Sequence, residues 1–120
     1  MQELEDSLRT YFGKHVQCIK LITGELVIGF VTNYNDTSFE LNFPYQVDGR
    51  VIKPYCEIIR EKSFRISFDQ IIFSKRPTPE FVEVYLEEVV INDSVELSTW
   101  LTKLTKELIV ASMEADRIVH

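Results

Sequence analysis

The chain has 120 residues, with 13 Lys and Arg against 19 Asp and Glu, so its formal net charge is -6. This length suits one domain with a core of its own, and 45% hydrophobic and 27% charged residues exclude a wholly disordered chain. No run of 18 apolar residues suggests a membrane span. Residues 1–6 lack the basic and apolar regions of a secretion signal, so we expect a cytoplasmic location. The acidity at first disfavours a polyanionic partner.

The first part of the chain predicts a short helix and then a β-hairpin. Residues 2–13 carry apolar side chains at helical spacing, which predicts an amphipathic helix. Residues 15–22 and 25–34 are rich in β-branched and aromatic residues, and Thr23-Gly24 between them predicts a tight turn. Both faces of the second run are apolar, so a helix or a neighbouring subunit must cover one of them.

Further strand-like runs predict a small closed barrel. These runs lie at 39–47, 51–53, 55–60, 64–68 and 71–73. Gly29 in the middle of a strand predicts a sharp bend, and Pro44 predicts an edge position or a bulge. About five strands with short connections favour closure, because a closed barrel has no exposed sheet edges. The predicted fold class is therefore mainly β.

The C-terminal part of the chain has helical patterning. Thr78-Pro79-Glu80 combines an N-cap hydroxyl, a proline at the first helical position and an acid in the first turn. The polar residues 92–94 predict the start of a second helix, whose apolar stripe from Leu97 to Leu108 favours core packing over a subunit contact. We therefore assign residues 1–76 to a barrel with an N-terminal helix. Residues 77–120 form a helical extension packed on the same domain.

No arrangement of residues indicates catalysis. The sequence places no Cys, Asp or Ser at a spacing from His15 or His120 that suggests a triad or metal site. Cys18 and Cys56 form no disulfide framework or metal cluster, and we expect reduced thiols. With four glycines the chain has no Gly-rich phosphate loop. We therefore expect a non-catalytic protein with no cofactor and no metal.

The predicted hairpin carries a family motif. Residues 21–36 read LITGELVIGFVTNYND and match the pattern LxxGxxφxGxφxxφD, with the acid one position late at Asp36. In this pattern, and in a helix that precedes five strands, the chain resembles the Sm/LSm family of small RNA-binding barrels, which includes bacterial Hfq. It looks like the Sm-like proteins encoded by marine bacterial viruses. The resemblance covers roughly residues 2–76.

The resemblance implies a closed homo-oligomeric ring that binds single-stranded RNA rich in uridine or adenine. In the family, the fourth strand of one subunit pairs with the fifth strand of the next. The loop after the second strand and the loop between the fourth and fifth strands bind the bases. By position, the implied nucleic-acid-binding residues are Asn33, Tyr34, Asn35, Asp36, Ser38 and Glu40 in the first loop and Asp69 and Gln70 in the second.

Positions in both loops depart from the family pattern. Glu40 stands where the family has a base-reading Asn, and Asp69-Gln70 stand where it has Arg-Gly. A carboxylate suits a base that offers an amino group rather than a phosphate. Ser38 occupies the family's stacking position. The usual uridine pocket is therefore altered in this chain.

The distribution of charge along the chain favours a nucleic-acid partner, although the total charge does not. Residues 1–47 have a net charge of -3, residues 48–76 of +3 and residues 77–120 of -6. The basic middle segment adds Arg65, Lys75 and Arg76 to the candidate binding residues, although a solvated strand face explains it equally well. Two functions remain: a ring that binds single-stranded nucleic acid, RNA more than DNA, in its processing or regulation, and a protein-assembly ring or adaptor without an RNA site.

Overall fold

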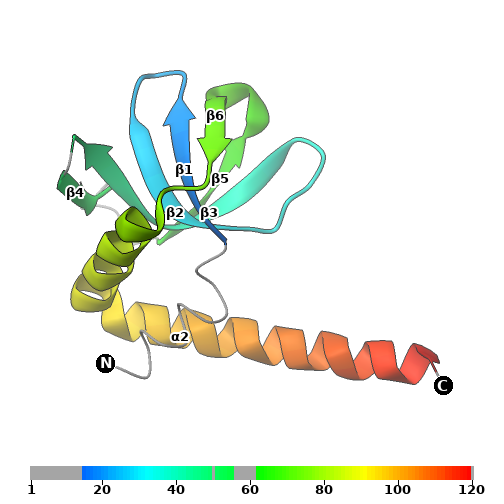
Figure 1. Cartoon of the computed structure of the whole chain (residues 1–120). Coiled ribbons are helices and arrows are strands. Elements are labelled where there is room, and N and C mark those ends of the chain that lie inside the picture. Colours follow the sequence, from blue (N-terminus) through cyan, green and yellow to red (C-terminus); the bar gives the residue numbers. More distant parts are fainter. Residues whose placement is uncertain (1–14, 50, 56–61, 120) are drawn as a thin grey trace.

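A computed structural model describes residues 15–49, 51–55 and 62–119, with side chains as far as Leu104 and at Lys106. A six-stranded antiparallel sheet is followed by one long helix (Figure 1). The elements are β1 (Val16–Leu21), β2 (Leu26–Thr32), β3 (Ser38–Asp48), β4 (Val51–Pro54), β5 (Ser63–Ser67), the 3-10 turn η3 (Phe68–Gln70), β6 (Ile71–Lys75) and α2 (Pro79–Val119). The N-terminal helix expected at 2–13 lies outside the described residues.

The sheet is open, so the prediction of a closed five-stranded barrel is wrong. Its strand order is β4-β3-β2-β1-β6, and β5 also pairs with β3. One edge of the 11-residue strand β3 serves two partners, because residues 45–48 pair with β4 and residues 38–42 pair with β5. Closure would require β5 to pair with β6, whereas β6 pairs with β1. Alternating polarity along each strand predicts strands, but it does not predict which edges meet.

The predicted bend lies at Gly29. The register of β2 on β3 shifts between Ile28 and Phe30, and Phe43 on the bulged strand has a φ of 52°. A Cβ atom added to Gly29 would lie 2.8 Å from the backbone oxygen of Asn42, so only glycine allows β3 to approach this closely. Pro44, which follows Phe43, lies in the same bulge, as expected for a proline that cannot donate to the ladder.

Hydrophobic cores lie on both faces of the sheet. The helix-side core joins β-strand residues to α2, and it includes Ile28, Phe30, Tyr45, Tyr85 and Leu97. The opposite core lies on the other face and is formed by buried residues of the strands alone: Ile19, Val27, Val31, Phe39, Leu41 and Ile66. The two apolar faces of β2 are thus both covered, and α2 is the helix that covers the face of Ile28 and Phe30.

Helix α2 begins and bends where the sequence indicates. The Thr78 Oγ1 accepts a hydrogen bond from the Phe81 N–H at 3.3 Å, as expected for an N-cap. Asp93 has non-helical φ and ψ of -130° and 30°, so the predicted second helix continues α2 beyond a kink. Leu97 and Leu101 are buried in the helix-side core, which confirms their packing role. Since α2 spans 41 residues, the fold is mixed α and β rather than mainly β.

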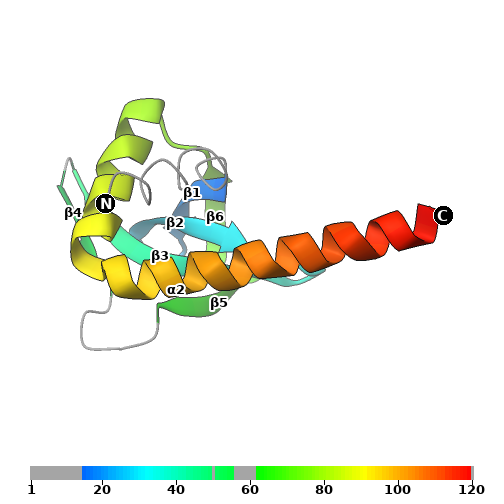
Figure 2. The same cartoon turned by 90° about the horizontal axis from the view of Figure 1, so that it is seen from below.

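Beyond the kink, α2 runs past the sheet. Figures 1 and 2 show the end of the helix at a distance from the strands in two perpendicular views. No helix in the described part of the chain is long and apolar enough to cross a membrane.

Polar side chains fix the kink to the sheet. Asp93 is buried and accepts a hydrogen bond from the Tyr45 hydroxyl at 3.0 Å. Its other oxygen lies 2.9 Å from the ammonium of Lys62, just before β5. Asn92 donates to the Tyr45 hydroxyl at 3.2 Å. The direction of α2 after the kink therefore depends on contacts with β3 and with the start of β5.

Candidate nucleic-acid interface

The loop between β2 and β3 is ordered by the side chain of Asn35. The Asn35 Oδ1 accepts hydrogen bonds from the backbone N–H groups of Thr37 and Ser38 at 2.9 and 2.8 Å. The Asn35 N–H in turn donates to the carbonyl of Ser38 at 2.9 Å. This is the turn-forming chemistry expected of Asn. It gives the loop a defined shape in which Tyr34 and Asp36 lie exposed.

The same loop is bound to the end of β5 and to η3. The Phe68 N–H donates to the carbonyl of Thr37 at 2.9 Å, and the Arg65 guanidinium donates to the carbonyl of Asn33 and to the Ser38 hydroxyl. At the last residue of η3, the Gln70 carbonyl accepts a hydrogen bond from the Ile22 N–H of the β1–β2 turn. The two loops implied by the resemblance therefore meet. We call residues 33–40 and 65–70 the two-loop surface.

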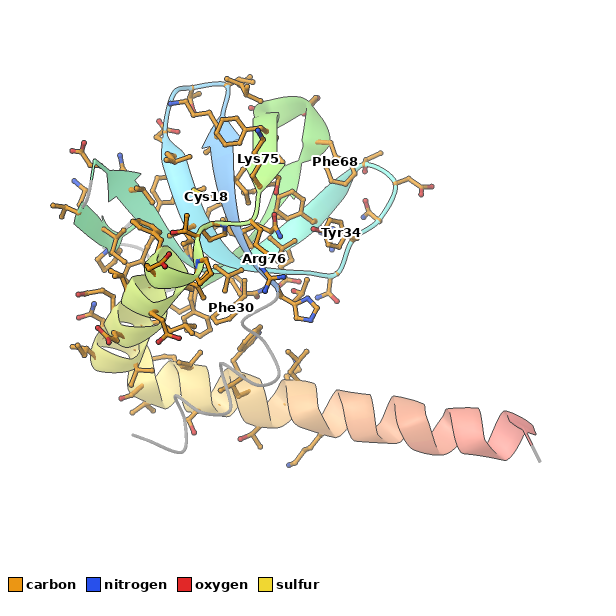
Figure 3. The ribbon with its side chains drawn as sticks, viewed as in Figure 1. Cys18, Phe30, Tyr34, Phe68, Lys75 and Arg76 are labelled. Atoms are coloured by element: carbon orange, nitrogen blue, oxygen red, sulfur yellow. The ribbon has the colours of Figure 1, made fainter. Side chains whose placement is uncertain are left out.

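Three aromatic rings join the two loops. The ring of Phe39 is buried, with 2% of its surface exposed, and its centroid lies 5.6 Å from that of Tyr34 and 5.9 Å from that of Phe68. Tyr34 is 64% exposed and Phe68 is 41% exposed. Figure 3 shows these two side chains at the same end of the sheet. The surface thus presents two exposed aromatic side chains that pack against one buried ring, and exposed aromatic rings are the groups on which unpaired bases stack.

Acidic side chains dominate the charge of the two-loop surface. The surface has one basic residue, Arg65, and three acidic residues: Asp36, Glu40 and Asp69. Glu40 lies opposite Arg65 in the strand pairing, yet its carboxylate accepts its hydrogen bond from the Asn33 amide, at 2.7 Å. The Gln70 amide is 3.5 Å from Asp69. With this balance, phosphate attraction at the surface is weak and contacts to the bases have to supply affinity.

The other predicted basic residues lie elsewhere. Lys75 is at the end of β6 that is farther from η3; it pairs with Cys18, and its ammonium lies 5.7 Å from the Phe73 ring centre. Arg76 follows β6 and is exposed. Within the described residues, neither makes a hydrogen bond or ion pair with the two-loop surface. The structure therefore brings together nine of the eleven predicted residues and leaves these two outside.

The prediction from sequence missed Phe68 as a member of the site. Its position in a predicted strand, 64–68, suggested a core residue, whereas the structure places it in η3. Two signals were available: Phe68 is one of the aromatic residues interleaved with the basic middle segment, and it stands one residue before Asp69-Gln70 in the implied second loop. Phe39 was recognised only as an apolar strand residue, although it supports both exposed rings.

The titratable groups that the structure describes form no metal centre and include two buried tyrosines. Among the described residues, no group of three His, Cys, Asp or Glu side chains could hold a metal ion. Burial raises the pKa of the Cys18 thiol, which keeps it in the unreactive protonated form near neutral pH. Burial also raises the pKa values of Tyr45 and Tyr85 in the helix-side core.

Comparisons with known proteins give no further constraint on the site. No model of a known protein family matches the chain, and no curated protein matches it either.

Proposed function

We propose that this protein binds single-stranded nucleic acid, RNA in preference to DNA, at the two-loop surface, as a non-catalytic Sm-like ring protein in RNA processing or regulation. The observation that carries the proposal is the meeting of the two loops around Tyr34, Phe39 and Phe68. Two exposed rings, each packed against the same buried ring, suit the stacking of unpaired bases.

The site chemistry favours contacts to bases over contacts to phosphates. Ring stacking is available only to unpaired bases, so a single strand binds and a duplex does not. The carboxylate of Glu40 accepts hydrogen bonds only, and it therefore suits a base edge that carries an amino group. Bases with an exocyclic amino group, such as adenine and cytosine, fit this requirement better than uridine. The proposed ligand is therefore a single strand that contains such bases, with poly-A as the probe, and its binding has a shallow salt dependence.

The ring part of the proposal is supported by the sheet edges. Strands β5 and β6 are joined by η3 and lie at the two ends of the path β5-β3-β2-β1-β6. Each has an edge that pairs with no strand among the described residues, and Ile72 and Phe73 of β6 are exposed. Open edges of this kind bind further strands. Pairing of β5 in one subunit with β6 in the next would bury these side chains and repeat the two-loop surface around the ring.

Fluorescence anisotropy with short labelled strands of poly-A, poly-U and random sequence at low salt tests the binding proposal. We expect Tyr34→Ala and Phe68→Ala each to weaken binding about five- to hundredfold, since base stacking on one ring is worth about 1–3 kcal/mol. Val51→Ala is the control, because Val51 is 67% exposed on β4, outside both the two-loop surface and the proposed subunit contact. It should leave the affinity unchanged.

Two outcomes would refute the proposal. One is no binding of any single strand by the wild-type protein at low salt. The other is binding that Tyr34→Ala and Phe68→Ala leave intact. Native mass spectrometry with and without these strands reports the subunit number, and a monomer in both conditions would refute the ring.

A protein-assembly ring or adaptor is the second candidate. The outer face of α2 favours it, because Val84, Ile91 and Val95 are exposed there, the last two by 69% and 74%. Binding of a protein partner that survives Tyr34→Ala but not Ile91→Asp would support this function instead.

A further inference from the structure

Arg65 was a candidate for contact with phosphate, but its surroundings indicate a different role. Its Nη1 donates to the Ser38 Oγ at 2.9 Å and to the Asn33 carbonyl at 3.2 Å, and its Nη2 donates to the same carbonyl at 3.2 Å. Three of the five N–H groups of the guanidinium are therefore directed into the β2–β3 loop.

The carbonyl that Arg65 holds belongs to the peptide group that joins Asn33 to Tyr34. Asn33 has a φ of 53°, in the left-handed region that residues other than glycine adopt at a cost in energy. The hydrogen bonds from Arg65 oppose rotation of this peptide group. Rotation there would turn the chain directly before Tyr34 and move its ring away from Phe39.

We infer that Arg65 is a positioning residue: it fixes the Asn33–Tyr34 peptide group so that the Tyr34 ring is held ready for a base. This inference rests on the proposed function, because it explains how the stacking surface is kept in place before a ligand binds. It also accounts for the guanidinium donating to Asn33 and Ser38 rather than to Glu40, its cross-strand neighbour, with which it makes no ion pair in the described part of the chain.

The variant Arg65→Lys separates positioning from charge. Lysine keeps the positive charge but lacks the planar fork that reaches two acceptors at once. We expect Arg65→Lys to weaken binding of a poly-A strand at least fivefold, nearly as much as Arg65→Ala, without changing the slope of log affinity against log salt. If Arg65 instead contacts a phosphate, Arg65→Lys keeps the affinity and Arg65→Ala lowers the slope by about one; that result overturns the inference.

A double-mutant cycle with Tyr34→Ala gives the second readout. If Arg65 acts through Tyr34, Arg65→Lys costs no further affinity in the Tyr34→Ala background, whereas additive losses overturn the inference. The matched control is Lys53→Ala, which removes an exposed cation of β4 outside the surface and should not couple to Tyr34.

Amide hydrogen exchange tests the same role without a ligand, so a failure of the proposed function can be told apart from a failure of this inference. The Thr37 and Ser38 amides, which donate to Asn35, should exchange faster in Arg65→Lys, while amides of β1 and β2 keep their protection. Unchanged exchange in the loop overturns the inference. Faster exchange throughout the sheet would assign Arg65 to general stability, which also overturns it.

Discussion

Replacing Lys62 with methionine tests whether the α2 kink is held electrostatically. The Lys62 ammonium lies 2.9 Å from the Asp93 carboxylate, and the exposed fractions of the two side chains are 36% and 9%. Removing one partner of a fully buried pair costs about 3–5 kcal/mol, whereas an exposed pair is worth about 0.2–1 kcal/mol. Water reaches Lys62, and the Tyr45 hydroxyl still donates to Asp93 in the variant. We therefore expect Lys62→Met to lower the free energy of unfolding by an intermediate amount, about 1–3 kcal/mol.

Urea unfolding followed by tryptophan fluorescence measures this loss. The only tryptophan, Trp100, packs against Phe30 and Phe43 in the helix-side core, so it reports on the contact between α2 and the sheet. Lys53→Met is the control for loss of an exposed lysine and should change stability by less than about 0.5 kcal/mol.

The double variant Lys62→Met/Asp93→Asn removes the unpaired charge and should recover part of the loss. A loss below about 0.5 kcal/mol in Lys62→Met would refute the reasoning. A double variant less stable than Lys62→Met would also refute it.

Two further changes follow from the bulge and from the buried tyrosines. Gly29→Ala should cost about 1–3 kcal/mol in urea unfolding, because its Cβ would lie 2.8 Å from the Asn42 backbone oxygen, and a near-neutral result would contradict the close approach. The pKa values of Tyr45 and Tyr85 are raised in the folded state, so their contribution to stability is complete below the unfolded value of about 10 and is lost as pH rises above it. The free energy of unfolding should therefore fall above about pH 10, less steeply in Tyr45→Phe, and an equal slope in that variant would contradict the assignment.

Local chemistry predicted much of the fold. The hairpin, the bulge at Gly29, the N-cap at Thr78 and the break at Asp93 each depend on a few neighbouring residues, and the structure has all four. The predicted second strand ends two residues too late, because Asn33 turns into the left-handed region after Thr32. Asparagine tolerates this conformation, and the polar cluster 33–38 is typical of a turn, but the pattern alone does not place the first residue of that turn.

Pairing between distant segments could not be predicted in the same way. The run 64–68 alternates like one strand, yet the strand ends at Ser67 and Phe68 belongs to η3. That boundary is set by the hydrogen bond from the Phe68 N–H to Thr37, a residue far away in the sequence. The same contact creates the two-loop surface. The candidate site was therefore predicted as two separate loops. The buried Phe39 ring, which packs against Tyr34 in one loop and Phe68 in the other, could be recognised as their link only from the tertiary structure.

The distribution of charge leads to a similar conclusion about mechanism. The excess of basic residues in the segment 48–76 suggests an electrostatic track, but its described members lie apart from the two-loop surface, Arg65 excepted. Lys53 lies on β4, Lys62 is paired with Asp93, and Lys75 and Arg76 lie at the end of β6 farther from η3. Arg65 remains at the two-loop surface, and its hydrogen bonds are made to the chain itself. When few cations contact phosphates, few counterions are released on binding. The slope of log affinity against log salt concentration should therefore be shallow. A steep slope that is insensitive to Tyr34→Ala would place the binding site on another face of the protein.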